Sequence, residues 1–143
     1  MVESAFLGGR VTRKTLPVMS PQPGAPPLKR LALPQGELAQ FHDGVEAIRY
    51  MAYIELRPGA LRGNHYHKIK REYVYVIGGK TELLVQDVNS ADRAVVLLQA
   101  GDLAFIETGI AHTLRPRSPG QAIEFSAAPF DPTDIYRFPL EFA

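Results

Sequence analysis

Cysteine is absent from all 143 residues of the chain, and several other features that would assign a class of protein are missing too. Without cysteine there are no disulfides and no thiolate ligands, so any bound metal must be held by nitrogen and oxygen atoms. No apolar run approaches the roughly 18 residues of a membrane span. The first residues, MVESAFLGGRVTRK, lack the apolar core of a signal peptide. A cytoplasmic location is therefore expected by default.

Charge is nearly balanced, with 16 basic and 15 acidic residues and a net charge of +1. No general field favours nucleic acid or an anionic membrane, so a small molecule is the expected partner. The length suits one domain with a sizeable core, and 45% hydrophobic and 22% charged residues are ordinary for a soluble globular protein. No internal repeat is visible, which argues for a single structural unit.

Two histidines, His65 and His67, stand two residues apart in the stretch GALRGNHYHKIKREYVYVIGG. On a β-strand such side chains point to the same face. Glu72 follows a short basic run that could turn the chain back, and it begins an apolar run that could form the adjacent antiparallel strand. Two imidazoles and a carboxylate suit zinc or another first-row divalent ion. A candidate fourth ligand, His112, comes later in a short strand of its own.

The spacing G-x5-H-x-H-x4-E-x6-G, filled by Gly59, His65, His67, Glu72 and Gly79, resembles the first motif of the cupin superfamily.

A second cupin motif, G-x5-P-x-G-x2-H-x3-N, is met at Gly101, Gly109 and His112. The sequence departs from it at Glu107, where proline is usual, and at Pro116, where asparagine is usual. Together the two motifs cover about half of the chain.

The resemblance implies an all-β, single-domain cupin, that is, a jelly-roll antiparallel β-barrel. It also implies a divalent ion (Zn, Mn, Ni or Fe) held inside by His65, His67, Glu72 and His112. A barrel lined by histidines but without a metal is the alternative.

Alternation of apolar residues predicts the strands of this barrel. In the run from Glu72 to Ile77, parity places Glu72 with Val74 and Val76 on one face and the tyrosines on the other. We expect Gly78 and Gly79 to form a hairpin turn. The other expected strands are 45–56, 80–88, 93–99, 102–106, 111–115 and 121–127.

Six of the twelve prolines lie between Pro17 and Pro34. Proline disfavours helix and cannot donate to a central ladder. We therefore expect residues 1–40 to form an extended proline-rich N-terminal arm, either a loose leader or an arm packing on a partner subunit, and residues 41–143 to form the barrel with a C-terminal lid or tail. Leu28, Leu31 and Leu33 give the arm something to bury, and dimeric cupins often exchange N-terminal strands. A homodimer is therefore expected.

The tail, AAPFDPTDIYRFPLEFA, contains an FDP step that resembles the end of cupin domains in nucleotide-sugar enzymes of bacterial polysaccharide biosynthesis. RGNHYHK followed by a glutamate is similar to the same group. The tail is interpreted as a lid or packing segment over the barrel, with a direct role in substrate binding as the alternative.

Three functions remain open at this stage. A divalent ion with open positions can polarise a carbonyl, which favours a metal-dependent isomerase or epimerase acting on a small carbonyl or sugar-like substrate. The same ligands with iron would suit a cupin-type dioxygenase, and a non-catalytic module that binds a small molecule is the third function. Epimerisation needs a general base, for which Glu107 and Tyr75 are the candidates.

Overall fold

Residues 1–142, which this computed structural model describes, form fourteen β-strands and two short 3-10 turns, Leu7–Gly9 and Pro132–Asp134. Neighbouring strands are antiparallel except for β3 and β4. The six-stranded sheet contains, in spatial order, β1 (Val2–Phe6), β2 (Val11–Thr15), β11 (Asp102–Ile106), β8 (Glu72–Gly78), β13 (Gly120–Ser126) and β6 (Tyr50–Leu56). The five-stranded sheet contains β10 (Arg93–Gln99), β9 (Lys80–Asp87), β12 (Ile110–Pro116), β7 (Arg62–Tyr66) and β14 (Tyr136–Arg137). A third sheet contains β3 (Val18–Met19), β4 (Lys29–Leu33) and β5 (Gly36–Gln40).

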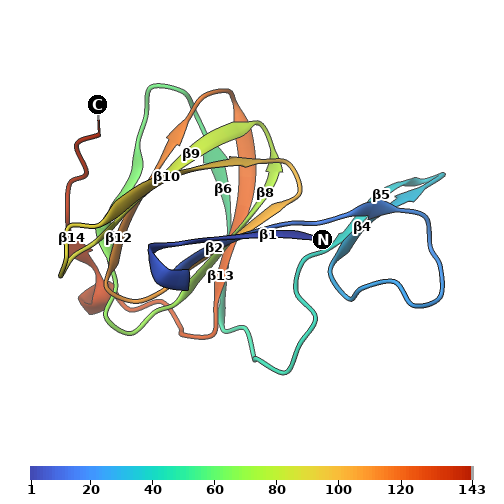
Figure 1. Cartoon of the computed structure of the whole chain (residues 1–143), viewed down its shortest axis with the longest axis horizontal. Coiled ribbons are helices and arrows are strands. Elements are labelled where there is room, and N and C mark those ends of the chain that lie inside the picture. The colour runs from blue at the N-terminus through green and yellow to red at the C-terminus, as the bar shows by residue number, and fades with distance from the viewer. Residues whose placement is uncertain (143) are drawn as a thin grey trace.

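The two large sheets face each other and enclose the main core (Figure 1). Because side chains alternate along a strand, each sheet sends every second residue inward. The core residues include Val11, Ile54, Leu56, Val74, Val76, Leu83, Val85, Val96, Leu98, Ala104, Ile106, Ile110, Leu114 and Ala122. The all-β cupin architecture expected from the sequence is therefore present, as a sandwich of antiparallel sheets.

Parity along β8 agrees with the prediction. Val74 and Val76 are buried in the main core, whereas Tyr75 packs on the opposite face of the sheet in a second apolar cluster with Leu103 and Phe125. Tyr73 packs against that second cluster. Glu72, which shares the parity of Val74, therefore points into the space between the sheets.

The turn at Gly79 differs from the expected hairpin. β8 and β9 lie in different sheets, so this glycine carries the chain around a corner of the sandwich. Gly79 has a φ of +81°, and a Cβ placed on it would lie 2.5 Å from the carbonyl oxygen of Pro119. Two corners of the sandwich pass close together here, which only glycine permits. A sequence pattern detects the positive φ but not the sheet to which the next strand belongs.

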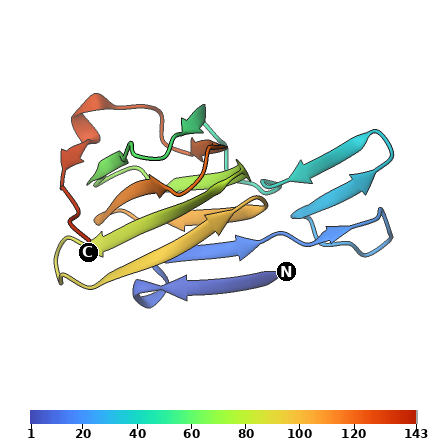
Figure 2. The same cartoon turned by 90° about the horizontal axis from the view of Figure 1, so that it is seen from above.

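The extended proline-rich N-terminal arm is not found among the described residues. β1 pairs with β2, and β2 pairs with β11 in the six-stranded sheet. Residues 18–40 form the third sheet, which projects beyond the barrel (Figures 1 and 2). All six prolines of this region fall outside strands, in connections and turns. They therefore interrupt the ladders without preventing them.

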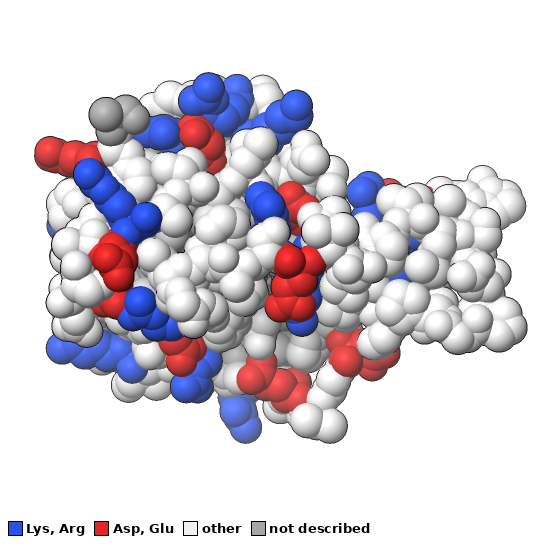
Figure 3. Space-filling view, viewed as in Figure 1, with Lys and Arg blue, Asp and Glu red and all other residues white. Residues whose placement is uncertain are grey.

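The segment that follows the projecting sheet returns over the outer face of the six-stranded sheet. Phe41 stacks on Tyr75 with 4.3 Å between ring centroids, and Leu28 and Ile48 pack against the same cluster. Charged side chains of both signs are scattered over the barrel, whereas the outer part of the projecting sheet is nearly free of them in this view (Figure 3).

None of the helices in residues 1–142 is long and apolar enough to cross a membrane. The cytoplasmic location expected from the sequence stays a prediction.

Candidate functional site

Three histidines meet between the two sheets. His65 lies on β7, His67 follows the end of that strand, and His112 lies on the neighbouring β12, where its Cα pairs with that of His65. One ring nitrogen of each histidine lies within 4.8 Å of the others. His67 and His112 are buried, and His65 is partly buried. The structure thus brings together the three imidazoles that were predicted from the sequence to be metal ligands.

A local distortion of β7 sets the direction of these side chains. Gly63 and Asn64 have φ values of +121° and +59°, and the pairing of β7 with β12 shifts register at His112 and Thr113. A Cβ on Gly63 would lie 2.7 Å from the carbonyl oxygen of His112, so glycine is needed at this point. Asparagine is one of the few other residues that adopts a positive φ readily. The RGN step before His65 therefore has a structural role in forming the site.

Glu72 approaches the histidines from the opposite sheet rather than from the adjacent antiparallel strand that we expected. Its Oε2 lies 2.9 Å from Nε2 of His112, and both side chains are less than one-tenth exposed. Lys70 Nζ lies 3.5 Å from Oε1 of the same carboxylate. His112 and Glu72 form a buried ion pair when the imidazole is protonated.

Hydrogen bonds from the outer nitrogens fix the orientation of two of the rings. Nδ1 of His67 lies 2.7 Å from the carbonyl oxygen of Asp134, and Nδ1 of His112 lies 3.0 Å from that of Ile110. A carbonyl can only accept, so each Nδ1 carries the proton and each Nε2 is the atom that faces the site. Nε2 of His67 has no hydrogen-bond partner among the described residues, whereas Nε2 of His112 faces the Glu72 carboxylate in the ion pair. A buried ring nitrogen without a partner is rare, and that of His67 fits a metal ion.

Burial and mutual interactions shift the pKa values of the four candidate ligands. Burial lowers the pKa of His65 to about 4, with contributions from His112 and His67, and burial likewise lowers the pKa of His67. Burial alone would raise the pKa of Glu72, but His112, Lys70 and His67 outweigh it and lower the pKa. Burial acts to lower the pKa of His112, and Glu72 outweighs it and raises the pKa. The site near neutral pH therefore holds two neutral imidazoles, a carboxylate and a paired His112.

Beside the histidines lies a cavity of about 150 Å³ whose polar lining the sequence analysis missed in part. Tyr50, on β6, donates a hydrogen bond of 2.9 Å to Glu124, on β13. Lys70 lies over the ring of Tyr50, with Nζ 4.1 Å from its centroid. Tyr50 and Glu124 lie 74 positions apart in sequence, and only their shared inward parity on paired strands could have suggested them.

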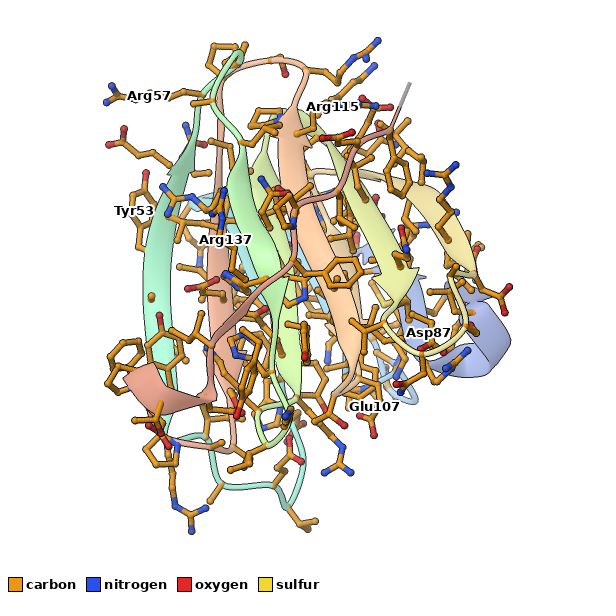
Figure 4. All side chains as sticks on the ribbon, turned by 90° about the vertical axis from the view of Figure 1, so that its left-hand side faces the viewer. Tyr53, Arg57, Asp87, Glu107, Arg115 and Arg137 are labelled. Atoms are coloured by element: carbon orange, nitrogen blue, oxygen red, sulfur yellow. The ribbon has the colours of Figure 1, made fainter. Side chains whose placement is uncertain are left out.

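A second hollow, of about 690 Å³, shares one lining residue with this cavity, Arg62. Tyr53, Arg57 and Leu61 also line it. Figure 4 shows Tyr53 and Arg57 projecting from the side of the barrel at β6.

Neither candidate for a general base reaches the histidines. Glu107 forms an ion pair with Arg71 at 2.7 Å, and Figure 4 shows it near the end of the barrel opposite to Arg57. Tyr75 lies on the outer face of the six-stranded sheet, stacked on Phe41. Neither lines the cavity beside the histidines.

An antiparallel sandwich with three histidines and a glutamate inside defines a jelly-roll protein with a candidate metal site. The family model for the cupin domain matches residues 52–126, more than half of the chain, and the chain therefore belongs to the cupin family.

Solved structures of sugar-modifying enzymes share this fold. A 3,4-ketoisomerase from Helicobacter canadensis is 17% identical, with a TM-score of 0.66 over 77% of this chain and 86% of that one. The dTDP-6-deoxy-D-glucose-3,5-epimerase RmlC from Legionella pneumophila, in complex with dTDP-4-keto-L-rhamnose, is 13% identical, with a TM-score of 0.74 over 95% of this chain and 76% of that one. The sugar 3,4-ketoisomerase QdtA from Thermoanaerobacterium thermosaccharolyticum, in complex with TDP, is 16% identical, with a TM-score of 0.68 over 77% of this chain and 83% of that one. No curated protein matches the sequence.

Proposed function

We propose that this cupin binds a divalent metal ion and isomerises or epimerises a keto sugar. The observation that carries the proposal is the convergence of three imidazoles, with ring nitrogens within 4.8 Å of one another, beside a buried carboxylate. His65, His67, His112 and Glu72 would hold the ion. When bound, such an ion polarises a substrate carbonyl and makes the neighbouring C–H more acidic.

The protein's own side chains supply a route for the proton. Tyr50 and Glu124 form a hydrogen-bonded pair at the wall of the cavity, facing the histidines. Burial raises the pKa of Tyr50 to about 12, with Glu124 contributing, so the phenol stays protonated. Burial, followed by Glu72, raises the pKa of Glu124. A carboxyl group with a raised pKa can accept a proton from carbon and return it, and the phenol can support the substrate oxygen by donating a hydrogen bond.

Returning the proton to the opposite face of the same carbon gives epimerisation. Delivering it to the former carbonyl carbon, while the hydroxyl proton moves to the former carbonyl oxygen, gives a ketoisomer. Ketoisomerisation needs one group that exchanges protons and one that holds the oxygens, and Glu124 and Tyr50 are the proposed pair. Epimerisation needs in addition a proton donor on the opposite face of the carbon, for which solvent water is the proposed source. Lys70, beside Glu72 and Tyr50, adds a positive charge where negative charge develops on oxygen.

A nucleotide-linked sugar is the proposed substrate class. The relatives described above act on or bind such compounds, and the cavity of about 150 Å³ opens next to a hollow of about 690 Å³. Arg62 lines both hollows and could pair with a diphosphate. The sugar would then occupy the cavity while the nucleotide extends past Arg62.

The metal is tested by elemental analysis of protein purified without a chelator or metal-affinity tag. About one zinc, manganese, nickel or iron ion per chain is expected. His65→Ala and His112→Ala should lose it while the far-UV spectrum stays unchanged. Absence of metal after incubation with each ion would refute the metal-dependent form of the proposal.

Activity is tested by NMR, following solvent deuterium uptake into a dTDP-linked 4-keto-6-deoxy sugar. Exchange at the carbon next to the carbonyl is expected, and Glu124→Gln should abolish it. Tyr73→Phe is the matched control for Tyr50→Phe, because Tyr73 lies on the outer face of the same sheet. Oxygen uptake without deuterium exchange would instead favour an iron dioxygenase, and tight binding without either reaction would favour a binding module.

We also propose a homodimer in which the third sheet packs on a second copy of the chain. This sheet projects beyond the barrel, and Val18 and Leu38 on it are 62% and 45% exposed. Sedimentation velocity should give a dimer that Leu38→Asp dissociates. A monomer at working concentration would refute this part of the proposal.

A further inference from the structure

Asp134 ends the 3-10 turn near the C-terminal end of the chain. Its side chain is buried against the turn that follows His67, residues 68–70. Its carboxylate accepts three backbone hydrogen bonds. Oδ1 accepts from N–H of Lys68 at 2.8 Å, Oδ2 accepts from Lys70 at 3.0 Å, and both oxygens lie 3.2 Å from N of Ile69. One side chain thus satisfies the N–H groups of residues 68–70, which follow His67.

The main chain of Asp134 makes a second contact with the site. Its carbonyl oxygen lies 2.7 Å from Nδ1 of His67. A single residue therefore fixes the turn that follows His67 and also the ring of His67. Few residues other than aspartate could do both, because the side chain must be short and must offer two acceptors to three N–H groups.

The surrounding segment is built to hold this residue in place. Asp131 caps the 3-10 turn by accepting from N–H of Thr133 at 2.9 Å. β14 then pairs with β7, placing Tyr136 opposite Tyr66 and Arg137 opposite His65. Phe138 N donates to the carbonyl of Asn64 at 2.7 Å. The segment therefore runs along the strand that carries the histidines.

We propose that Asp134 is a positioning residue for the metal site, holding Nε2 of His67 toward the ion and setting the turn that presents Lys70 and Glu72. The proposal rests on the proposed metal binding and deepens it. Asp134 contacts no reacting atom. Its effect passes through the orientation of His67 and through the backbone of residues 68–70.

Removal of the carboxylate would leave three backbone N–H groups without their acceptors. Such groups take up water or change the loop conformation, since a buried donor without a partner costs about 1–3 kcal/mol. The carbonyl of residue 134 would then no longer be held against Nδ1 of His67. Outer hydrogen-bond partners of metal-bound histidines typically change metal affinity about 10–100-fold when they are mutated.

The test compares Asp134→Ala and Asp134→Asn with Asp102→Ala. Asp102 is a matched control because it too is buried and accepts local hydrogen bonds, from N–H of Gln99 at 2.9 Å and from the hydroxyl of Thr15 at 2.7 Å. Asp102 lies on β11 and does not line the cavity beside the histidines. Zn²⁺ affinity is measured by competition with a chromogenic chelator. The tautomer of His67 is measured in the metal-free protein by long-range ¹H–¹⁵N correlation, and stability by urea unfolding.

We expect Asp134→Ala to bind Zn²⁺ about 10–100-fold more weakly, and the protonated Nδ1 of His67 to be replaced by a mixture of tautomers. Asp134→Asn keeps one acceptor oxygen and should fall between the alanine variant and the wild type. Asp102→Ala should lose stability but keep both the affinity and the tautomer. If Asp134→Ala does not fold, the asparagine variant provides the same comparison.

Equal Zn²⁺ affinities and unchanged His67 tautomers in the Asp134 and Asp102 variants would overturn the inference and leave Asp134 a purely structural residue. Failure of the wild type to bind any metal would refute the proposed metal site instead. In that case the tautomer in the metal-free protein still decides whether Asp134 orients His67.

Discussion

Replacing His112 by alanine in the metal-free protein should lower the free energy of unfolding by about 3 kcal/mol. The reason is that Glu72 stays buried and loses its nearest cation, which lies 2.9 Å away. Removing one partner of a buried ion pair typically costs about 3–5 kcal/mol. We take the lower end of that range because Lys70 remains 3.5 Å from the other carboxylate oxygen.

The assay is urea unfolding in the presence of EDTA, so that no bound metal contributes. For a chain of this size, about 3 kcal/mol corresponds to roughly 10 °C in Tm. His42→Ala is the control. His42 is exposed and its ring donates a hydrogen bond to the carbonyl of Glu46, so a change within about 0.5 kcal/mol is expected.

A double-mutant cycle then separates the ion pair from simple loss of packing. Glu72→Gln removes the charge that His112→Ala leaves uncompensated, so the double variant should lose less stability than the sum of the two single variants, by about 2 kcal/mol. Additive losses, or a loss below about 1 kcal/mol for His112→Ala alone, would show that the pair is not coupled in this way.

Three further predictions concern protons and the backbone. Binding of Zn²⁺ at pH 6.0 should release about one proton per site, because Glu72 raises the pKa of His112 above 6.5. Calorimetry in buffers of different ionisation enthalpy measures the number of protons released, and His112→Ala should release almost none. The metal-free protein should lose stability as pH falls from 6.5 toward about 4, because the folded state keeps His65 neutral while the unfolded state takes up a proton there. His65→Gln should flatten this part of a plot of urea midpoint against pH. An equal slope in both proteins would contradict the lowered pKa of His65. Gly79→Ala should cost at least about 1–3 kcal/mol in urea unfolding, because φ is +81° and the carbonyl of Pro119 lies where the new methyl group would be; a neutral change would show that this corner relaxes freely.

Parity along β8 was enough to place Glu72 inside the barrel, and the HxH spacing was enough to bring His65 and His67 together. Both follow from the two-residue period of a strand, which sequence displays directly. The sequence does not show in the same way which strand will lie opposite. Glu72 reaches His112 across the sandwich because the chain turns a corner at the basic run before β8, whereas a hairpin would give the same local pattern.

The residues that sequence analysis missed are those brought in by long-range pairing. Tyr50 and Glu124 meet because β6 and β13 are neighbours in the six-stranded sheet, and Asp134 meets His67 because β14 adds to the edge of β7. Tyrosine, glutamate and aspartate are common outside functional sites, so none of them forms a recognisable motif. The prolines were misleading for a different reason: they mark the turns of the third sheet, and their density suggested an arm without strands.

Asp134 is synthesised 67 residues after His67, the ring that its carbonyl holds. During translation residues 68–70 therefore emerge before Asp134, whose carboxylate accepts their N–H hydrogen bonds. Under the proposed metal binding, an ion that arrives at this stage would meet a turn without its acceptor, whereas one that arrives after β14 has docked would meet an assembled set of ligands. Metal loading would then follow chain completion, and folding intermediates that lack the C-terminal segment would exchange their ion rapidly.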